Sequence, residues 1–359
     1  MTYEELLSLE PYSLSQVRKN ELFVELLGAL TEKHRQMSYC YADIIRTLGY
    51  DRKEFQTVQD IPFLPVRLFK HLDLMSIPKE NIFKMMTSSG TSGQQVSKIY
   101  LDKETASWQQ KTLAKIVSSF IGTSRLPMII LDCPSVLKNR HSFSARGAGI
   151  LGFSMFGRKS IYALDDNMDL QYEVVRDFLQ EHKGEDILLF GFTFMVWKYF
   201  LQAVKDRNLF FDLSNGFLLH GGGWKKLAQE SVSNEQFRQE LAKICGLKYV
   251  HSYYGMVEQT GPICMECEAG HLHVSNCSDI IMRRSRDFSP CDIGEPGIVQ
   301  VLTPMPQSYP GHSLLTEDEG VLLGVDDCPC GRKGKYFKIM GRLANAELRG
   351  CSDTYAVGK

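Results

Sequence analysis

The chain has 359 residues, of which 43% are hydrophobic and 23% charged, a composition typical of globular proteins and not of disordered or fibrous ones. A chain of this length is expected to form about two domains. Its 41 basic and 42 acidic residues give a formal net charge of -1. This balance argues against a protein that binds duplex nucleic acid, since such proteins usually carry a basic surplus.

No stretch of the sequence offers the roughly 20 uncharged apolar residues that a membrane-spanning helix needs. The acidic, amphipathic start MTYEELLSLEPYS lacks the basic and apolar regions of a signal peptide. Without an export signal, the ten cysteines are expected to be thiols or metal ligands and not disulfides. The sequence therefore predicts a cytoplasmic protein.

The first fifty residues show the apolar spacing of helices, for example at Leu22, Leu26 and Leu30, and Gly49 supplies a stop. Three prolines interrupt any long helix between about 56 and 84. We therefore expect residues 1–80 to form a helical part of the main domain.

An α/β core is expected over residues 81–270, where apolar strands alternate with helices between about 126 and 255. The predicted strands are Met128–Leu131, Ile187–Phe190, Gly216–Leu219 and Lys248–His251, and the predicted helices lie around 170–182, 193–206 and 224–245. Continuous apolar runs that alternate with helices indicate a mainly parallel sheet buried on both faces.

A smaller β-rich subdomain is expected over residues 271–341, followed by a short tail, 342–359. Its predicted strands are Ile280–Met282, Gly297–Leu302, Gly320–Val325 and Lys335–Ile339, separated by Gly and Pro turns. The predicted fold class is therefore α/β, with mixed and parallel sheets flanked by helices and a small β-rich unit.

The sharpest motif is the segment Thr87–Gln94, TSSGTSGQ. Small hydroxylated residues between glycines offer backbone N–H groups and hydroxyls that can surround a polyphosphate. The segment lacks the GK[ST] ending of a Walker loop, and Lys98–Leu101 after it is predicted as a strand. A flexible surface turn is the alternative for this motif taken alone.

A second glycine motif, His220–Trp224 (HGGGW), follows a predicted strand and precedes a helix. Glycines at the carboxyl end of a buried strand allow a flat ligand to approach the backbone, where open α/β sheets usually bind ligands. A tight strand-to-helix connection is the alternative.

The third motif, Ser252–Gln259 (SYYGMVEQ), also follows a strand. An aromatic ring beside a glycine offers a stacking surface, and the carboxylate of Glu258 can hold a divalent cation near phosphates. A residue at the start of a helix is the alternative for Glu258 alone.

Two further motifs are Leu314–Gly320 (LLTEDEG) and Ile339–Arg342 (IMGR). The first is predicted to place its carboxylates in a turn between strands. Asp318 could accept both hydroxyls of a ribose, and Arg342 could reach the same sugar or a phosphate. Solvated charges in turns are the alternative for each.

Together and in this order, the five motifs resemble the adenylate-forming superfamily of acyl- and aryl-CoA ligases from about residue 80 to 350. The chain looks nearest to the phenylacetate-CoA ligase branch, through Gly294–Gly297 (GEPG) and Cys328–Arg332 (CPCGR). It looks closer still to the acyl-protein synthetase subunit of bacterial fatty-acid reductase complexes.

The resemblance implies a role for each motif. The loop residues Ser88, Ser89, Gly90, Thr91, Ser92 and Gly93 would hold ATP phosphates, with Thr91 acting in catalysis. Gly221, Gly222 and Gly223 would flank adenine, and Tyr253, Tyr254 and Gly255 would line the adenine and acyl sites. Glu258 would bind Mg²⁺, and Asp318 and Arg342 would bind ribose.

Two features depart from the CoA ligases that the chain resembles. Those ligases continue beyond the hinge into a C-terminal domain with a catalytic lysine, whereas this sequence ends at Lys359, so we expect that domain to be truncated. Many relatives also place a lysine directly after the last glycine of the loop, where this chain has Gln94.

The tail contains Cys351, preceded by Arg349 and Gly350. The thiolate is the reactive form of cysteine, and a neighbouring cation favours it. The arrangement resembles acyl-protein synthetases, in which a cysteine near the C-terminus accepts the activated acyl group. An incidental surface thiol is the alternative.

A metal site is suggested by the pair Cys264 and Cys267 before two histidines, and by Cys328 and Cys330 about sixty residues later. Paired soft ligands on two turns suit a tetrahedral structural zinc. By likeness to phenylacetate-CoA ligases, the favoured ligands are Cys267, His273, Cys328 and Cys330, with Cys264 as substitute. Ordinary reduced cysteines in turns are the alternative.

The leading hypothesis is an ATP-dependent, AMP-forming acid–thiol ligase that activates a carboxylic acid as an acyl-adenylate. A fatty acid is the favoured substrate. The acyl group would pass to Cys351 and then to a partner acyl reductase. The alternatives are an aryl- or acyl-CoA ligase of the phenylacetate-CoA ligase type and a zinc-stabilised binding protein without activity.

Overall fold

The computed structural model describes residues 1–50, 54–88, 95–137, 145–224 and 231–343. The chain divides into two compact units. Over the described residues, the first unit spans 1–88, 95–120 and 255–343, and the second spans 121–254. Among the described residues, none of the helices combines the length and the apolar character needed to traverse a lipid bilayer.

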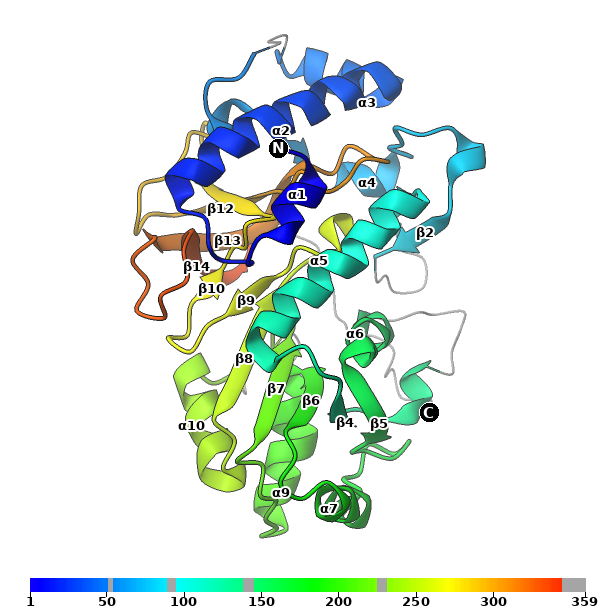
Figure 1. The fold of residues 1–359 in the computed structure, drawn as a ribbon, viewed down its shortest axis with the longest axis vertical. Helices are drawn as coiled ribbons and strands as arrows, with labels where there is room; N and C mark the ends of the chain where they lie inside the picture. Colours follow the sequence, from blue (N-terminus) through cyan, green and yellow to red (C-terminus); the bar gives the residue numbers. More distant parts are fainter. Residues whose placement is uncertain (51–53, 89–94, 138–144, 225–230, 344–359) are drawn as a thin grey trace. The chain divides into compact units, whose positions relative to one another are not determined.

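The first unit packs helices against a mainly antiparallel sheet (Figure 1). Its helices are α1 (Tyr3–Ser8), α2 (Gln16–Met37), α3 (Tyr39–Thr47), α4 (Leu68–His71) and α5 (Lys103–Ile121). Side chains of α1 and α2, including Leu6, Phe23 and Leu27, share a buried cluster with Ile281 and Leu302 of the sheet. This cluster explains the apolar spacing of the N-terminal segment, since one face of each helix is buried.

The sheet of the first unit has the strand order β11-β12-β13-β14-β10-β9, and β1 pairs in parallel with β13. Its strands are β1 (Leu64–Pro65), β9 (Cys264–Glu266), β10 (Leu272–His273), β11 (Asp279–Arg283), β12 (Pro296–Leu302), β13 (Ser313–Val325) and β14 (Lys335–Arg342). A separate two-stranded sheet joins β2 (Lys84–Thr87) to β3 (Lys98–Leu101), so the strand predicted at 98–101 is present.

The prediction of a turn over Leu314–Gly320 is wrong, because this segment is the first half of the 13-residue strand β13. Leu314 pairs with Leu64 on one side and Val301 on the other. Pairing with neighbouring strands satisfies the backbone of the segment, and this outweighs the low strand propensity of its acidic residues.

The second unit is a parallel sheet in the order β8-β7-β6-β4-β5 with helices around it (Figure 1). The strands are β4 (Leu126–Ile130), β5 (Gly157–Tyr162), β6 (Ile187–Phe192), β7 (Gly216–Gly221) and β8 (Tyr249–Tyr254). Every residue of β4 and β6 is buried, as the continuous apolar runs predict. The predicted α/β class with mixed strands and flanking helices is confirmed.

The helices of the second unit are α6 (Ala145–Phe153), α7 (Tyr172–Glu181), α8 (Thr193–Met195), α9 (Gln202–Asp206) and α10 (Asn234–Cys245). A six-residue π-helical segment, Val196–Leu201, connects α8 to α9. Helix α10 is the described part of the helix predicted around 224–245; it begins at Asn234, and residues 225–230 lie outside the described residues. Ser233 explains this start, because its hydroxyl caps the helix by accepting from the Gln236 amide at 3.1 Å.

Candidate functional site

Glu258 lies in a short 3₁₀ turn, Val257–Gln259, of the first unit, and its side chain is buried. Two hydrogen bonds anchor this turn. The Tyr309 hydroxyl donates to the Glu258 carbonyl at 2.8 Å, and the side-chain amide of Gln259 donates to the Gly311 carbonyl at 2.7 Å. The backbone that carries Glu258 is therefore held by the loop that leads into β13.

The electrostatic surroundings of Glu258 favour its protonated form. Burial raises the pKa of Glu258, and the nearby carboxylate of Glu317 raises it further, while Ser97 and Arg342 act in the opposite direction. A cation bound next to this buried carboxylate would stabilise its ionised form. Its hard oxygen atoms are the ligands that Mg²⁺ prefers.

Asp318 and Arg342 pair across the ladder between β13 and β14, and the Arg342 Nε atom lies 3.4 Å from Asp318 Oδ1. Arg342 also donates to Glu317 Oε2 at 3.0 Å. The other oxygen of Glu317 forms an ion pair with Arg67, directly before α4. The structure thus brings Asp318 and Arg342 together and adds two charged residues, Glu317 and Arg67, to them.

Sequence reasoning assigned no role to Glu317 or Arg67. Glu317 lies inside the LLTEDEG motif, next to Asp318, and could have been found there. Arg67 carries no signal in the sequence, since 250 residues separate it from its partner. Only the parallel pairing of β1 with β13 places the two segments side by side.

The glycine-serine loop is described only at its base. Strands β2 and β3 flank it, and two hydrogen bonds close the base: Ser88 N to Ser97 O at 3.1 Å, and Ser97 N to Ser88 Oγ at 2.9 Å. Ser89, Gly90, Thr91, Ser92 and Gly93 lie outside the described residues, as does Cys351 in the tail. The hairpin therefore delivers the two ends of the loop to one place.

In the second unit, the HGGGW motif forms the end of β7 and the turn after it, as predicted. A side chain at Gly221 would come within 2.5 Å of the Tyr253 ring, and one at Gly222 within 2.9 Å of the Phe192 ring. Gly222 also has a positive φ of 74°. Both residues must therefore be glycine, and the backbone at Gly222 and Gly223 is exposed.

Tyr253 and Tyr254 end β8, beside β7 in the parallel sheet. The Tyr253 ring packs against Phe153 with centroids 5.0 Å apart and stacks on Phe190 at 6.5 Å. Gly221 pairs with Tyr253 in the register of the two strands. The carboxyl edge of this sheet thus joins the glycine turn to aromatic side chains, which is where open α/β sheets bind ligands.

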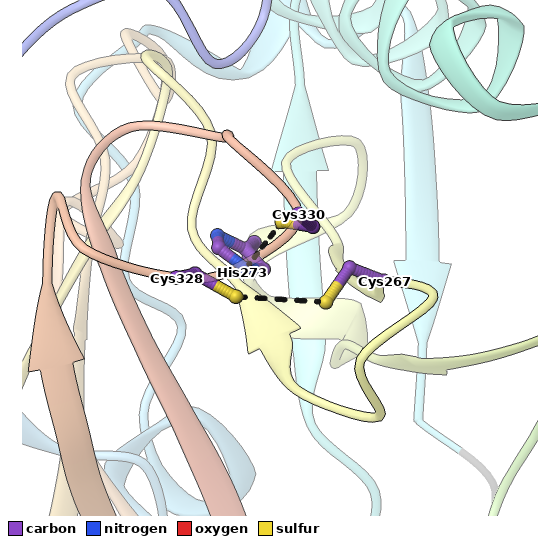
Figure 2. Close-up of side chains that lie close together, drawn as sticks. All are labelled: Cys267, His273, Cys328 and Cys330. Atoms are coloured by element: carbon purple, nitrogen blue, oxygen red, sulfur yellow. Dashed lines mark hydrogen bonds between the residues drawn. The ribbon is translucent and has the colours of Figure 1, made fainter.

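The four predicted metal ligands Cys267, His273, Cys328 and Cys330 converge in the first unit, with their ligand atoms all within 4.8 Å of one another. Figure 2 shows the four side chains directed toward a common centre, from the β9–β10 hairpin and the turn after β13. The Cys267 and Cys328 sulfur atoms are 3.9 Å apart. Cys264 is buried in β9 and lies outside this described group.

The chemistry of this group suits zinc. With Zn–S bonds of about 2.3 Å, a tetrahedral ion separates two sulfur ligands by about 3.8 Å, close to the observed spacing. Burial lowers the pKa of His273 to about 4, so its imidazole is neutral and able to act as a ligand. Although burial opposes it, hydrogen bonds from Arg332 lower the pKa of Cys330, whereas burial raises that of Cys328 to about 12.

Comparison with known proteins places the chain in a family. The family model for the acyl-protein synthetase LuxE matches residues 2–357. A long-chain-fatty-acid–luciferin-component ligase of Aliivibrio fischeri is 23% identical over 304 residues, covering 82% of this chain and 78% of that protein. Its counterpart in Vibrio harveyi is 19% identical over 357 residues, covering 95% and 89%.

The fold is also found in solved structures. A 2-hydroxyisobutyryl-CoA ligase, in an open conformation with its acyl-AMP and CoA, superimposes with a TM-score of 0.68 and 14% identity, covering 94% of this chain and 77% of that one. A postadenylation state of the ligase gives the same score at 15% identity. The fold is thus that of an adenylate-forming ligase, and the chain belongs to the acyl-protein synthetase (LuxE) family of acid–thiol ligases.

Proposed function

We propose that this protein uses ATP and Mg²⁺ to activate a fatty acid, transfers the acyl group to Cys351 and delivers it to a partner acyl reductase. The family match over nearly the whole chain carries this proposal. The two curated relatives, named as ligases of long-chain fatty acids, support the choice of acid. The clustering of Asp318, Arg342 and Glu317 supports the assignment of a nucleotide-binding surface to β13 and β14.

In the first half-reaction, a carboxylate oxygen of the acid attacks the α-phosphorus of ATP, and the bond to the departing pyrophosphate breaks. No proton moves, because the carboxylate is already a nucleophile; the barrier is the repulsion between negative charges. Bound at Glu258, Mg²⁺ would supply positive charge against the phosphates. The loop Ser88–Gly93 with Thr91 would donate hydrogen bonds to phosphate oxygens.

The resemblance to adenylate-forming ligases assigns nucleotide-binding residues to each unit separately. In the first unit, Asp318 would accept hydrogen bonds from the ribose hydroxyls while Arg342 holds the Asp318 carboxylate in place. In the second unit, Gly221–Gly223 would flank adenine, with Tyr253 and Tyr254 beside them. Gly255 would leave room for the acyl group.

In the second half-reaction, the Cys351 thiolate attacks the acyl carbon, the carbon–oxygen bond breaks and AMP leaves. The product is a thioester, which divides one difficult condensation into two easier steps. A second thiol, on the acyl reductase, can then take the acyl group from Cys351 by thioester exchange. The resemblance to acyl-protein synthetases supports this role of Cys351.

We further propose a structural zinc ion held by Cys267, His273, Cys328 and Cys330. The four ligand atoms converge, and the His273 Nε2 atom lies 3.4 Å from the Cys330 sulfur. A bound cation would polarise this imidazole and stabilise the thiolate forms of the cysteines. The ion would tie the hairpin between β9 and β10 to the turn after β13.

The proposal is tested by incubating the protein with ATP, Mg²⁺ and a radiolabelled fatty acid, followed by denaturing gel electrophoresis. We expect a labelled band that hydroxylamine removes and that Cys351→Ser abolishes. Acid-dependent pyrophosphate exchange should survive in Cys351→Ser, because Cys351 acts after activation. A soluble CoA thioester without labelled protein would replace the proposal with an acyl-CoA ligase, and no adenylate with any acid would favour a binding protein.

A further inference from the structure

Thr193, the first residue of α8, forms three close contacts with the glycine motif of the second unit. Its hydroxyl oxygen lies 2.7 Å from the Gly222 carbonyl oxygen, 3.3 Å from that of Gly221 and 2.9 Å from His220 Nδ1. Thr193 and His220 are both buried. One buried hydroxyl therefore connects the end of β6 to the turn after β7.

The single hydroxyl hydrogen of Thr193 determines the direction of these hydrogen bonds. A threonine hydroxyl donates one hydrogen, and the shortest contact places it on the Gly222 carbonyl. The same oxygen then accepts from His220, which must carry its proton on Nδ1. The result is a relay in which His220 orients the Thr193 hydroxyl and the hydroxyl orients the Gly222 peptide.

The surroundings of His220 favour its neutral form. Burial lowers the pKa of His220 to about 3, with His251 and Arg238 contributing in the same direction. Its Nε2 atom is buried and has no hydrogen-bond partner among the described residues, which agrees with a tautomer protonated at Nδ1. The His220 ring packs on Phe237 with centroids 4.8 Å apart, so its orientation is fixed.

The segment that begins at Thr193 also contacts the other end of the glycine turn. Trp197, in the π-helical segment, packs edge-on against Trp224 with centroids 5.7 Å apart. Isolated π-helical turns are rare and occur frequently at functional sites. The glycines between these two contacts carry no side chains of their own, so Thr193 and Trp197 supply the support that the turn lacks.

We infer that Thr193 and His220 are positioning residues for nucleotide binding, because they hold the exposed Gly222 peptide in the orientation that accepts the base of ATP. The inference rests on the proposed function, in which Gly221–Gly223 flank adenine. A carbonyl oxygen has two lone pairs, and Thr193 occupies one at Gly222. Fixing this peptide fixes the pattern of donors and acceptors that the turn presents to the base edge.

The consequence is a selective effect on ATP binding. Thr193→Val keeps the shape of the side chain but removes the hydroxyl, which frees the Gly222 peptide to rotate. We expect KM for ATP to rise about tenfold, the effect of one lost hydrogen bond, with little change in kcat. Selectivity for ATP over GTP should fall, since adenine and guanine differ in donors and acceptors at the edge that the turn faces.

The experiment compares four variants in acid-dependent pyrophosphate exchange, with thermal unfolding measured in parallel. Thr193→Ser should restore KM and selectivity. His220→Asn, which keeps a donor near the Nδ1 position, should resemble wild type, whereas His220→Leu should resemble Thr193→Val. These histidine variants keep the inference testable if Thr193→Val does not fold.

Thr31→Val is a matched control. Thr31 is also buried, donates to a backbone carbonyl (Leu27 at 2.8 Å) and contacts a histidine (His312 Nε2 at 2.9 Å), but it belongs to helix α2. This variant should lose thermal stability without a change in KM for ATP or in selectivity.

Two results would overturn the inference: wild-type KM and selectivity in a folded Thr193→Val protein, or an equal shift in KM in Thr31→Val. In either case, exchange by the wild-type protein would leave the proposed function standing. Absence of exchange in the wild-type protein with every acid tested would instead reject the proposed function, and this inference with it.

Discussion

Asp318 and Arg342 face each other from neighbouring strands, with Arg342 Nε 3.4 Å from Asp318 Oδ1, and Arg342 is held at the same time by Glu317 at 3.0 Å. Arg342 is the last residue of β14 and precedes Cys351 by nine residues in the sequence. Strand pairing therefore holds the proposed ribose ligand beside the arginine that leads into the tail.

Asp318→Asn removes the charge that would accept the ribose hydroxyls. We expect kcat/KM for ATP to fall about 10- to 100-fold, since a hydrogen bond to a charged group contributes about 1.5–3 kcal/mol. The measurement is acid-dependent pyrophosphate exchange with ATP and with 2′-deoxy-ATP. The wild-type protein should prefer ATP and the variant should not; an unchanged preference in Asp318→Asn would exclude Asp318 as the ribose ligand.

Glu258→Gln should separate activity from stability. Since burial raises the pKa of Glu258, its protonated form stabilises the fold and this contribution is lost as pH rises through the folded pKa. The neutral glutamine should therefore raise Tm at neutral pH, while exchange falls at least about 100-fold, the usual scale for losing one group that stabilises charge in a transition state. Calorimetry and exchange assays check both effects.

The direction of the same pKa shift also predicts how pyrophosphate exchange declines at low pH. Binding of Mg²⁺ requires the ionised Glu258, whose pKa burial raises, so exchange should decline as pH falls through this raised pKa. Higher Mg²⁺ concentrations should move this decline to lower pH, because the cation competes with the proton. If the decline at low pH does not respond to the Mg²⁺ concentration, a group other than Glu258 causes it.

Cys328→Ser should abolish the metal centre. We expect one zinc ion per chain in the wild-type protein by atomic emission, and none in this variant, because Cys328 is one of the four converging ligands. Chelation should lower the Tm of the wild-type protein and leave that of the variant unchanged. Cys291→Ser, at a half-buried cysteine outside the group, should keep its zinc; a metal-free wild-type protein purified with zinc present would contradict the assignment.

Two stacked histidines, His34 and His312, should make the first unit sensitive to acid. Their centroids are 5.1 Å apart, and burial lowers the pKa of His312 to about 3 and that of His34 well below its ordinary value. The unfolded chain binds protons below about pH 6.5 while the folded chain does not, so this stability is lost as pH falls from 6.5 toward 3.

At pH 5 the cost from His312 alone is about 2 kcal/mol. His312→Gln retains a polar group that can reach Thr31, the partner of His312 Nε2. The Tm of this variant should fall less than that of the wild-type protein between pH 7 and pH 5. Equal losses in both proteins would show that other groups cause the acid sensitivity.

The sequence predicted four strands of the second unit, β4, β6, β7 and β8. Two of them, β4 and β6, are buried throughout and form continuous apolar runs in the sequence. Strand β5 was not predicted. It pairs with β4 at the edge of the sheet and carries the exposed or half-exposed residues Arg158 and Lys159, and such charges are typical of edge strands. The apolar-run criterion therefore detects central strands and misses this one.

For the candidate site, local motifs were enough to locate glycines and carboxylates, because their chemistry depends on residue type and short spacing. The partners of these residues came only from the fold. Arg67 reaches Glu317 through the pairing of β1 with β13, and Thr193 reaches Gly222 because β6 and β7 are neighbours. Contacts between distant segments are decided when strands select their neighbours, and no periodicity within one segment records that choice.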